Sequence, residues 1–387
     1  MTAAAPAAHR LITTAAELVD VAAALATAPW VALDTESNSM FVYREQVCLL
    51  QLNAGGVIFV IDPLALGVVA NATPSSALAV LKPGLERRDR PLWLHGGEYD
   101  VACMKRDFGI ALGGVFDTQQ AASLLGWAKT GYGSVVEKLC GVVLGKAWAT
   151  YDWATRPLDP GALAYAVDDV VYLPEVAVEL KKLVAQADIV DEVDVANAVV
   201  AAYDWTGGFD PEGFWRMRDT EHLSPSSVRV LKRLFAWRDA AAEAAGVPAG
   251  RYLNNEVVLA LARHPPKTMG DLKDARLKSA IIADHGRTIL QHVVDSAADP
   301  VPSPPTSTRP SSAVMARETR LKTWRREEAE RRSVADGRTV PLQLVLPARA
   351  LEFLKSREPD VDLSTVPQLG ARRAARYGGV LRALLAP

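Results

Sequence analysis

The sequence predicts an α/β domain, built on a mixed sheet flanked by helices, followed by two all-α helical domains. Three β-rich runs follow one another near the N-terminus, and strands then alternate with helical patterns until about residue 202. Beyond that point the patterns are helical, with a Gly-rich break at 207–214 and a Pro- and Ser-rich break at 299–312. The predicted parts are a first domain at 1–207, a helical domain at 208–298, a linker at 299–312 and a second helical domain at 313–387.

The first three strands are expected at 30–35, 47–52 and 57–63. The run WVALDT has four apolar residues followed by polar ones, as in a buried strand with an exposed end. VCLLQL and VIFVIDP are rich in β-branched and aliphatic residues, and the turn signal AGG separates them. Because the three runs are close together along the chain, we expect an antiparallel meander.

The later elements alternate between the two types. PLWLH at 91–95 and VFDT at 115–118 are expected as short strands. Helical patterns cover six segments, at 75–82, 98–108, 119–127, 134–141, 160–182 and 186–202. Strands that alternate with helices favour parallel pairing, so the complete sheet should be mixed.

Composition excludes several classes of protein. Of 387 residues, 49% are hydrophobic and 23% are charged, which excludes a mostly disordered chain, a collagen-like chain and a coiled-coil rod. Three scattered cysteines without a CxxC pair argue against a disulfide framework or a structural zinc site. No apolar run reaches the ~18–20 residues of a membrane span, and no signal-peptide pattern occurs. We therefore expect a cytoplasmic protein without a membrane partner.

Charge is divided unevenly along the chain. Residues 1–210 contain 14 Lys and Arg against 25 Asp and Glu, whereas residues 211–387 contain 29 against 20. An acidic half can hold divalent cations, and a basic half can hold a polyanion. Chance scatter of charge is the simpler alternative.

Four carboxylates and one tyrosine are the candidate catalytic residues. Asp34 and Glu36 project from the same face at the end of the first strand, and Asp100 lies near the start of a helix. Tyr165 and Asp169 share a helix face at i, i+4, which Asp168 does not. Each has an ordinary structural explanation when taken alone. As a set they match two-metal phosphodiester hydrolysis, in which paired Mg²⁺ or Mn²⁺ ions bind hard oxygen ligands.

These residues also resemble a known family. DTE at 34–36, HGGEYD at 95–100 and YAVDD at 165–169 resemble the three motifs of the DEDD exonucleases, in the tyrosine-bearing (DEDDy) branch. FDTQQAASLLG and DWATRPL resemble the segments between these motifs in the ribonuclease D family, and the helical parts resemble HRDC domains. The resemblance implies a ribonuclease H-like exonuclease domain followed by two HRDC-like domains, the second divergent.

The resemblance also implies roles for the residues. Asp34, Glu36 and Asp169 would bind the metal ion that holds the attacking water, and Asp34 with Asp100 would bind the second. Tyr165 would position the water. The implied reaction is 3′→5′ hydrolysis that releases nucleoside 5′-monophosphates, and the implied partner is RNA, including tRNA precursors or other structured RNA with a free 3′ end. No protein partner is inferred.

Contacts with the substrate are predicted at four further positions. Ser37 and Asn38 stand where many relatives have a residue that touches the terminal base, so Met40 and Phe41 could take that role. Lys146 and Arg156 could contact phosphates, although Arg156 could equally be a structural ion-pair partner. We expect His95 to be structural, and Trp148 and Trp153 to pack beneath the helix of the third motif rather than stack a base.

Two other functions remain open from the sequence. A DNA exonuclease of the same superfamily would have the same carboxylates, because only contacts with the 2′-hydroxyl distinguish RNA. A catalytically idle nucleic-acid-binding protein is the alternative from a different class. The complete set of carboxylates and Tyr165 argues against it.

Overall fold

The computed structural model describes residues 7–70, 73–275, 277–304 and 310–386. The described residues form two compact units. The first unit consists of the described residues within 1–37, 46–205 and 309–387. The second unit consists of the described residues within 38–45 and 206–308. Part of the predicted linker, at 305–309, lies outside the described residues.

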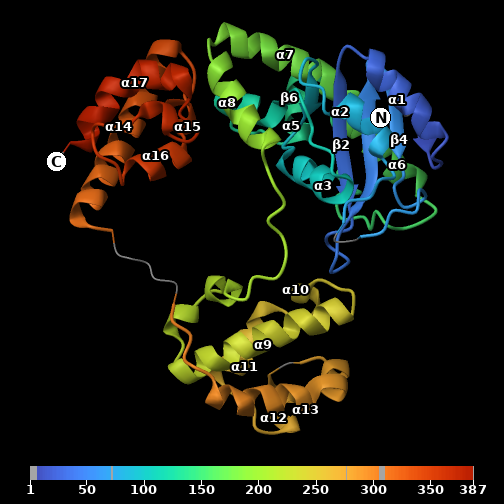
Figure 1. Ribbon diagram of the computed structural model, residues 1–387, viewed down its shortest axis with the longest axis vertical. Coiled ribbons are helices and arrows are strands. Elements are labelled where there is room, and N and C mark those ends of the chain that lie inside the picture. Colours follow the sequence, from blue (N-terminus) through green and yellow to red (C-terminus); the bar gives the residue numbers. More distant parts are fainter. Residues whose placement is uncertain (1–6, 71–72, 276, 305–309, 387) are drawn as a thin grey trace. The chain divides into compact units, whose positions relative to one another are not determined.

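The first unit is built on a six-stranded mixed sheet with the order β1-β4-β3-β2-β5-β6 (Figure 1). β2–β3 and β3–β4 pair antiparallel, which confirms the predicted meander, and the other neighbours pair parallel. The strands are β1 (His9–Ile12), β2 (Val31–Ser37), β3 (Val47–Ala54), β4 (Val57–Ile61), β5 (Leu92–Leu94) and β6 (Val115–Asp117).

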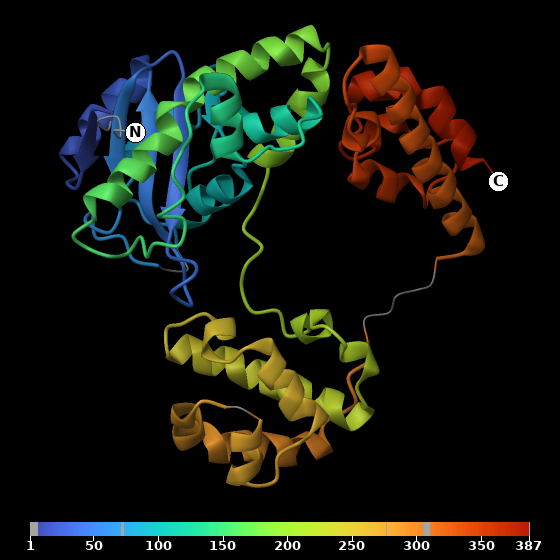
Figure 2. The ribbon, with the colours of Figure 1, turned by 180° about the vertical axis from the view of Figure 1, so that it is seen from behind.

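The sheet has a separate apolar core on each face. Val31 and Leu33 pack with α1 (Glu17–Thr27) and α3 (Glu98–Phe108), whereas the intervening Ala32 packs in the core on the opposite face. Figure 2 shows α6 lying across that opposite face. The helices there are α4 (Thr118–Leu124), α5 (Tyr132–Cys140), α6 (Pro160–Val171) and α7 (Leu173–Gln186), and α8 (Val190–Ala201) follows them. The alternation along β2 places residues 34 and 36 on the face of α6.

Two predicted helices differ from the structure. The single helix expected at 160–182 is wrong, because α6 ends at Val171 and α7 begins at Leu173. Pro174 lies in the first turn of α7, where its missing N–H costs nothing, but it could not continue a helix from α6. The helix expected at 75–82 is also wrong, since only a 3₁₀ turn, Ala79–Leu81, precedes the short α2 (Lys82–Leu85). Neither β1 nor α1 was predicted.

The described parts of the chain beyond residue 206 are helical, as predicted. The second unit contains 3₁₀ turns at Gly213–Arg216, Thr220–His222 and Ser296–Ala298, and helices α9 (Pro225–Ala244), α10 (Ala249–Tyr252), α11 (Asn255–Arg263), α12 (Met269–Asp274) and α13 (Ser279–Asp295). The C-terminal block contains α14 (Ser312–Asp336), α15 (Leu342–Val345), α16 (Ala348–Leu354), a 3₁₀ turn at Leu363–Thr365 and α17 (Gly370–Leu385). No helix among the described residues is long and apolar enough to cross a membrane.

The C-terminal block belongs to the first unit, a grouping that the sequence did not predict. Gln343 donates a hydrogen bond to Ser123 of α4, and Arg372 pairs with Asp188 after α7. Gly126 lies so close to the carbonyl oxygen of Thr339 that an added Cβ would be 2.1 Å from it. The block therefore packs directly on the helices that cover the sheet.

Candidate active site

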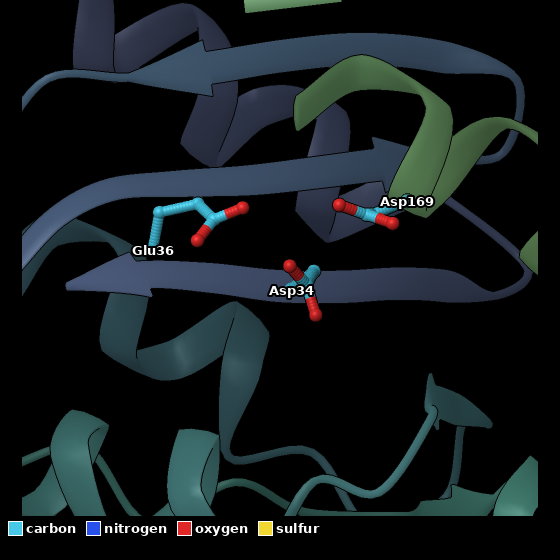
Figure 3. A group of neighbouring side chains, drawn as sticks. All are labelled: Asp34, Glu36 and Asp169. Atoms are coloured by element: carbon cyan, nitrogen blue, oxygen red, sulfur yellow. The ribbon is translucent and has the colours of Figure 1, made fainter. Parts of the chain in front are cut away.

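Three of the predicted carboxylates converge on one point of the sheet. Asp34 and Glu36 extend from β2, and Asp169 faces them from α6 (Figure 3). Each offers an oxygen atom, and these atoms all lie within 4.8 Å of one another. Residues more than 130 positions apart along the chain thus form one cluster that could hold a metal ion.

The local structure explains this convergence. Asp34 and Glu36 are two residues apart in β2, so both side chains leave the same face of the strand. Helix α6 begins at Pro160, where the side chain of Asp159 caps it by accepting from the N–H of Gly161. Because α6 packs across β2 and β3, Asp169 near its end is brought to the carboxylates of the strand.

Burial and mutual repulsion raise the pKa of all three carboxyl groups. For Asp34 the pKa is raised well above its ordinary value, first by burial and then by Asp100, Asp169 and Glu36. Burial, followed by neighbouring carboxylates, raises the pKa of Glu36 to about 9 and that of Asp169 to about 7. Crowded hard oxygen donors of this kind fit a divalent cation, whose charge would offset the repulsion.

Asp100 lies beside this cluster but outside the group of three. It is buried at the start of α3, and its Oδ1 atom accepts a hydrogen bond of 2.5 Å from Thr35 Oγ1. Burial raises the pKa of Asp100 to about 6, and the Thr35 hydrogen bond opposes this shift. Thr35 points to the opposite face of β2 from Asp34, so the strand supports the site from both of its faces.

Tyr165 lies one helical turn before Asp169, as predicted. Burial, and then Asp169, Glu36 and Asp34, raise the pKa of its hydroxyl, so the phenol is neutral at physiological pH. The ring of Trp153 lies 6.2 Å from the ring of Tyr165, and Trp153 is 3% exposed. This confirms that Trp153 packs beneath the helix of the third motif.

A second tyrosine lies at the site, and sequence analysis did not identify it. The hydroxyl of Tyr132, on α5, donates to the carbonyl oxygen of Asp168 at 3.2 Å, and burial, followed by Asp169 and Asp34, raises its pKa. Its ring lies 5.2 Å from that of His95, which is held by a 2.8 Å hydrogen bond to Thr118 Oγ1. These contacts favour the structural role expected for His95. No local pattern in the sequence connects α5 with α6.

Arg156 and Lys146 have contrasting surroundings. Arg156 makes a bidentate ion pair with Asp62, at 2.7 and 2.8 Å, and also donates to the carbonyl oxygens of Trp153 and Cys48. These contacts favour the structural alternative, and a phosphate contact stays an untested prediction. The side chain of Lys146 is exposed and makes no hydrogen bond or ion pair within the described ranges, so its ammonium group is available to a phosphate.

Met40 and Phe41 lie in the segment that belongs to the second unit. There the guanidinium of Arg251 donates to the carbonyl oxygen of Met40 at 2.8 Å and lies 4.9 Å from the centre of the Phe41 ring. The side chain of Met40 is exposed. Contact of these side chains with a terminal base remains a prediction.

Comparison with known proteins gives matches over both units. A family model described as 3′-5′ exonuclease matches residues 9–185, and one described as HRDC domain matches residues 227–293. Ribonuclease D of Sphingobium indicum is 32% identical over 277 residues, covering 70% of this chain and 68% of the relative. Ribonuclease D of Nitrobacter hamburgensis is 32% identical over 67% of this chain and 65% of the relative. This chain therefore aligns with about two thirds of the length of each.

A solved structure has a similar fold. The crystal structure of Escherichia coli RNase D, described as an exoribonuclease involved in structured RNA processing, superposes with a TM-score of 0.71. The match covers 98% of each chain at 24% sequence identity. At this identity the likeness concerns the fold alone.

Proposed function

Because this chain belongs to the ribonuclease D family and is a 3′→5′ exoribonuclease, we propose that it removes nucleoside 5′-monophosphates from RNA by two-metal-ion hydrolysis at Asp34, Glu36, Asp100 and Asp169. The observation that supports this mechanism is the convergence of the Asp34, Glu36 and Asp169 oxygens within 4.8 Å. A cluster with so many like charges is costly unless a cation is present.

The carboxylates divide into two overlapping ligand sets. Asp34, Glu36 and Asp169 would hold one divalent cation, and Asp34 together with Asp100 would hold the second. When bound, Mg²⁺ or Mn²⁺ ions lower the pKa of a coordinated water and offset the charge that develops on the phosphate. The hydrogen bond from Thr35 fixes the orientation of Asp100, so that its second oxygen can face the site.

Tyr165 is the residue that would orient the attacking water. Its neutral hydroxyl can hydrogen-bond to a water near Asp169, but a phenol with a raised pKa is poorly suited to remove a proton as a free phenolate. Glu36 lies at the end of β2, where it would meet the terminal 3′-hydroxyl. A contact with that hydroxyl would limit hydrolysis to the end of a strand.

We propose that the substrates are structured RNAs with free 3′ ends, including precursors of tRNA. The excess of Lys and Arg in residues 211–387 supports a polyanionic ligand longer than the few nucleotides that an active site holds. A role in tRNA 3′-end processing would place the protein in the cytoplasm.

A product assay with end-labelled strands tests this function. Single-stranded RNA and DNA of the same sequence, labelled at the 3′ or the 5′ end, are incubated with Mg²⁺, with Mn²⁺ or with EDTA. We expect the 3′ label to be released at once as a mononucleotide from RNA, the 5′-labelled strand to shorten stepwise, and neither to change in EDTA. Internal cleavage, or equal activity in EDTA, would contradict the proposal.

A further inference from the structure

A large cleft in the first unit lies apart from the carboxylate site. Its volume is about 1110 Å³. One wall is formed by residues 125–127 and the end of α7, and the other by α14 and α17 of the C-terminal block. None of the four carboxylates, nor Tyr165, lines it, so the proposed chemistry leaves its role open.

Four arginines and three carboxylates line this cleft, so its net charge is slightly positive. Arg331 pairs with Glu328, and both Arg332 and Arg338 lie near Asp336. Arg376 lines the cleft from α17. Its side chain is exposed and makes no hydrogen bond or ion pair with any residue that the structure describes.

The carboxylate of Asp188, on the wall opposite Arg376, is already engaged. Its side chain accepts a hydrogen bond from Arg372, a residue outside the cleft lining. Arg376 helps to lower the pKa of Asp188, after the hydrogen bond from Arg372, but makes no ion pair with it, so its exposed guanidinium can still meet an anionic ligand.

Aromatic rings lie on both walls. Trp127 is partly buried, with the ammonium of Lys138 3.6 Å from its ring centre. Across the cleft, Trp324 is partly buried and meets Tyr377 edge-on, with 5.2 Å between ring centres. Cations beside aromatic rings are typical of sites for single-stranded nucleic acid, where the bases stack and the phosphates pair with charge.

A short segment of chain connects the cleft with the carboxylate site. Trp127 lines the cleft, and Tyr132, five residues later, donates to the carbonyl oxygen of Asp168 beside Asp169. Five residues span at most roughly 17 Å, which is about the rise of five stacked nucleotides at ~3.4 Å each. A strand with its 3′ end at the carboxylates would need only a few more nucleotides to reach the cleft.

We propose that this cleft binds the upstream, single-stranded part of the RNA whose 3′ end occupies the carboxylate site. Arg376 pairs with a phosphate there, and Trp324 and Trp127 stack bases. This inference rests on the proposed function. It adds a binding site that contributes affinity for long RNA and is not needed for hydrolysis of a very short one.

The test compares Arg376→Glu and Trp324→Ala with the matched control Arg326→Glu. Arg326 is exposed on the same helix, α14, two residues or roughly 200° around from Trp324, and it does not line the cleft. Fluorescence anisotropy measures binding of a labelled single-stranded RNA of twenty nucleotides in EDTA over a range of salt concentrations. Hydrolysis of a trinucleotide in Mg²⁺ is measured for the same proteins, and thermal unfolding checks their folding.

The expected result is a loss of affinity of at least about tenfold for Arg376→Glu, with a salt slope smaller by ~0.7, the value for one phosphate contact. Trp324→Ala should lose roughly fivefold or more. If the Trp324→Ala protein is unfolded, Trp127→Ala, on the other wall, is tested in its place. Arg326→Glu should change affinity less than twofold, and all variants should hydrolyse the trinucleotide as the unaltered protein does.

Two results would overturn the inference. One is unchanged affinity in the cleft variants, which would mean that the cleft holds something other than RNA, such as an acidic segment of protein. The other is an equal loss in Arg326→Glu, which would mean that general charge attraction, and no defined cleft, binds the strand. If the unaltered protein binds the long RNA through the cleft but fails to hydrolyse either RNA, the proposed function is wrong, while the inference that the cleft binds RNA still holds.

Discussion

At the scale of single residues, the site depends on how each side chain is charged and held. Asp34, Glu36 and Asp169, which the structure brings together, were predicted from the i, i+2 pair on β2 and the i, i+4 spacing on α6, read as one set of motifs. Asp100 and Tyr165 were predicted as members of the same set. Thr35 and Tyr132 were not predicted as partners of Asp100 and Asp168. Their hydrogen bonds join residues 65 and 36 positions apart, a separation at which no local pattern acts.

Replacing Tyr165 by Phe tests whether the hydroxyl orients the water. We expect kcat to fall roughly 10- to 100-fold, the equivalent of one hydrogen bond to a charged group, with little change in KM. Steady-state hydrolysis of single-stranded RNA measures both constants. Loss of binding with unchanged kcat would instead mean that Tyr165 contacts the substrate only in its ground state.

The raised pKa values predict how stability depends on pH when no metal is present. Because Glu36 and Asp169 bind protons more tightly in the folded protein than in the unfolded chain, their contribution to stability is complete below their unfolded pKa values and is lost as pH rises through their folded pKa values. In EDTA, the melting temperature should fall between about pH 5 and pH 9. Glu36→Gln should flatten this dependence, and a profile that rises over the same range would contradict it.

At the scale of elements, hydrophobic periodicity predicted β2, β3 and β4 because each is short, apolar and close to its neighbours. The helix at 160–182 was predicted as one piece because its apolar pattern continues past Pro174, although a proline there can only begin a new helix. Strand β1 was missed because only Ile12 of its four residues is buried, so its pattern is weak.

Arg156 connects two elements, and its replacement distinguishes its two suggested roles. Arg156→Ala leaves the carboxylate of Asp62 buried without its partner, so we expect a loss of about 2–4 kcal/mol in the free energy of unfolding. Chemical denaturation measures this loss. Lys146→Ala is the matched control, expected to change stability by less than about 0.5 kcal/mol. A stable Arg156→Ala protein with weakened RNA binding would favour the phosphate contact instead.

At the scale of the whole molecule, acidic residues are in excess in the first 210 residues, which contain the carboxylate site, and basic residues are in excess in the rest of the chain. Charge counts along the sequence indicated this division, and the carboxylate cluster lies within the acidic half. The sequence could not show that the described residues of 309–387 pack with the exonuclease sheet, because contacts such as Gln343 with Ser123 join residues 220 positions apart.

We propose that the carboxylates perform the chemistry while other parts of the molecule provide most of the RNA affinity. The most direct measurement compares Asp169→Asn with Asp168→Asn, its neighbour on α6, for both single-turnover hydrolysis in Mg²⁺ and RNA binding. We predict that Asp169→Asn lowers the rate at least about a thousandfold, the equivalent of ~4 kcal/mol, and binds RNA within about twofold of the unaltered protein. Asp168→Asn should keep most of the rate. Retained hydrolysis in Asp169→Asn, or an equal loss in both variants, would contradict the account.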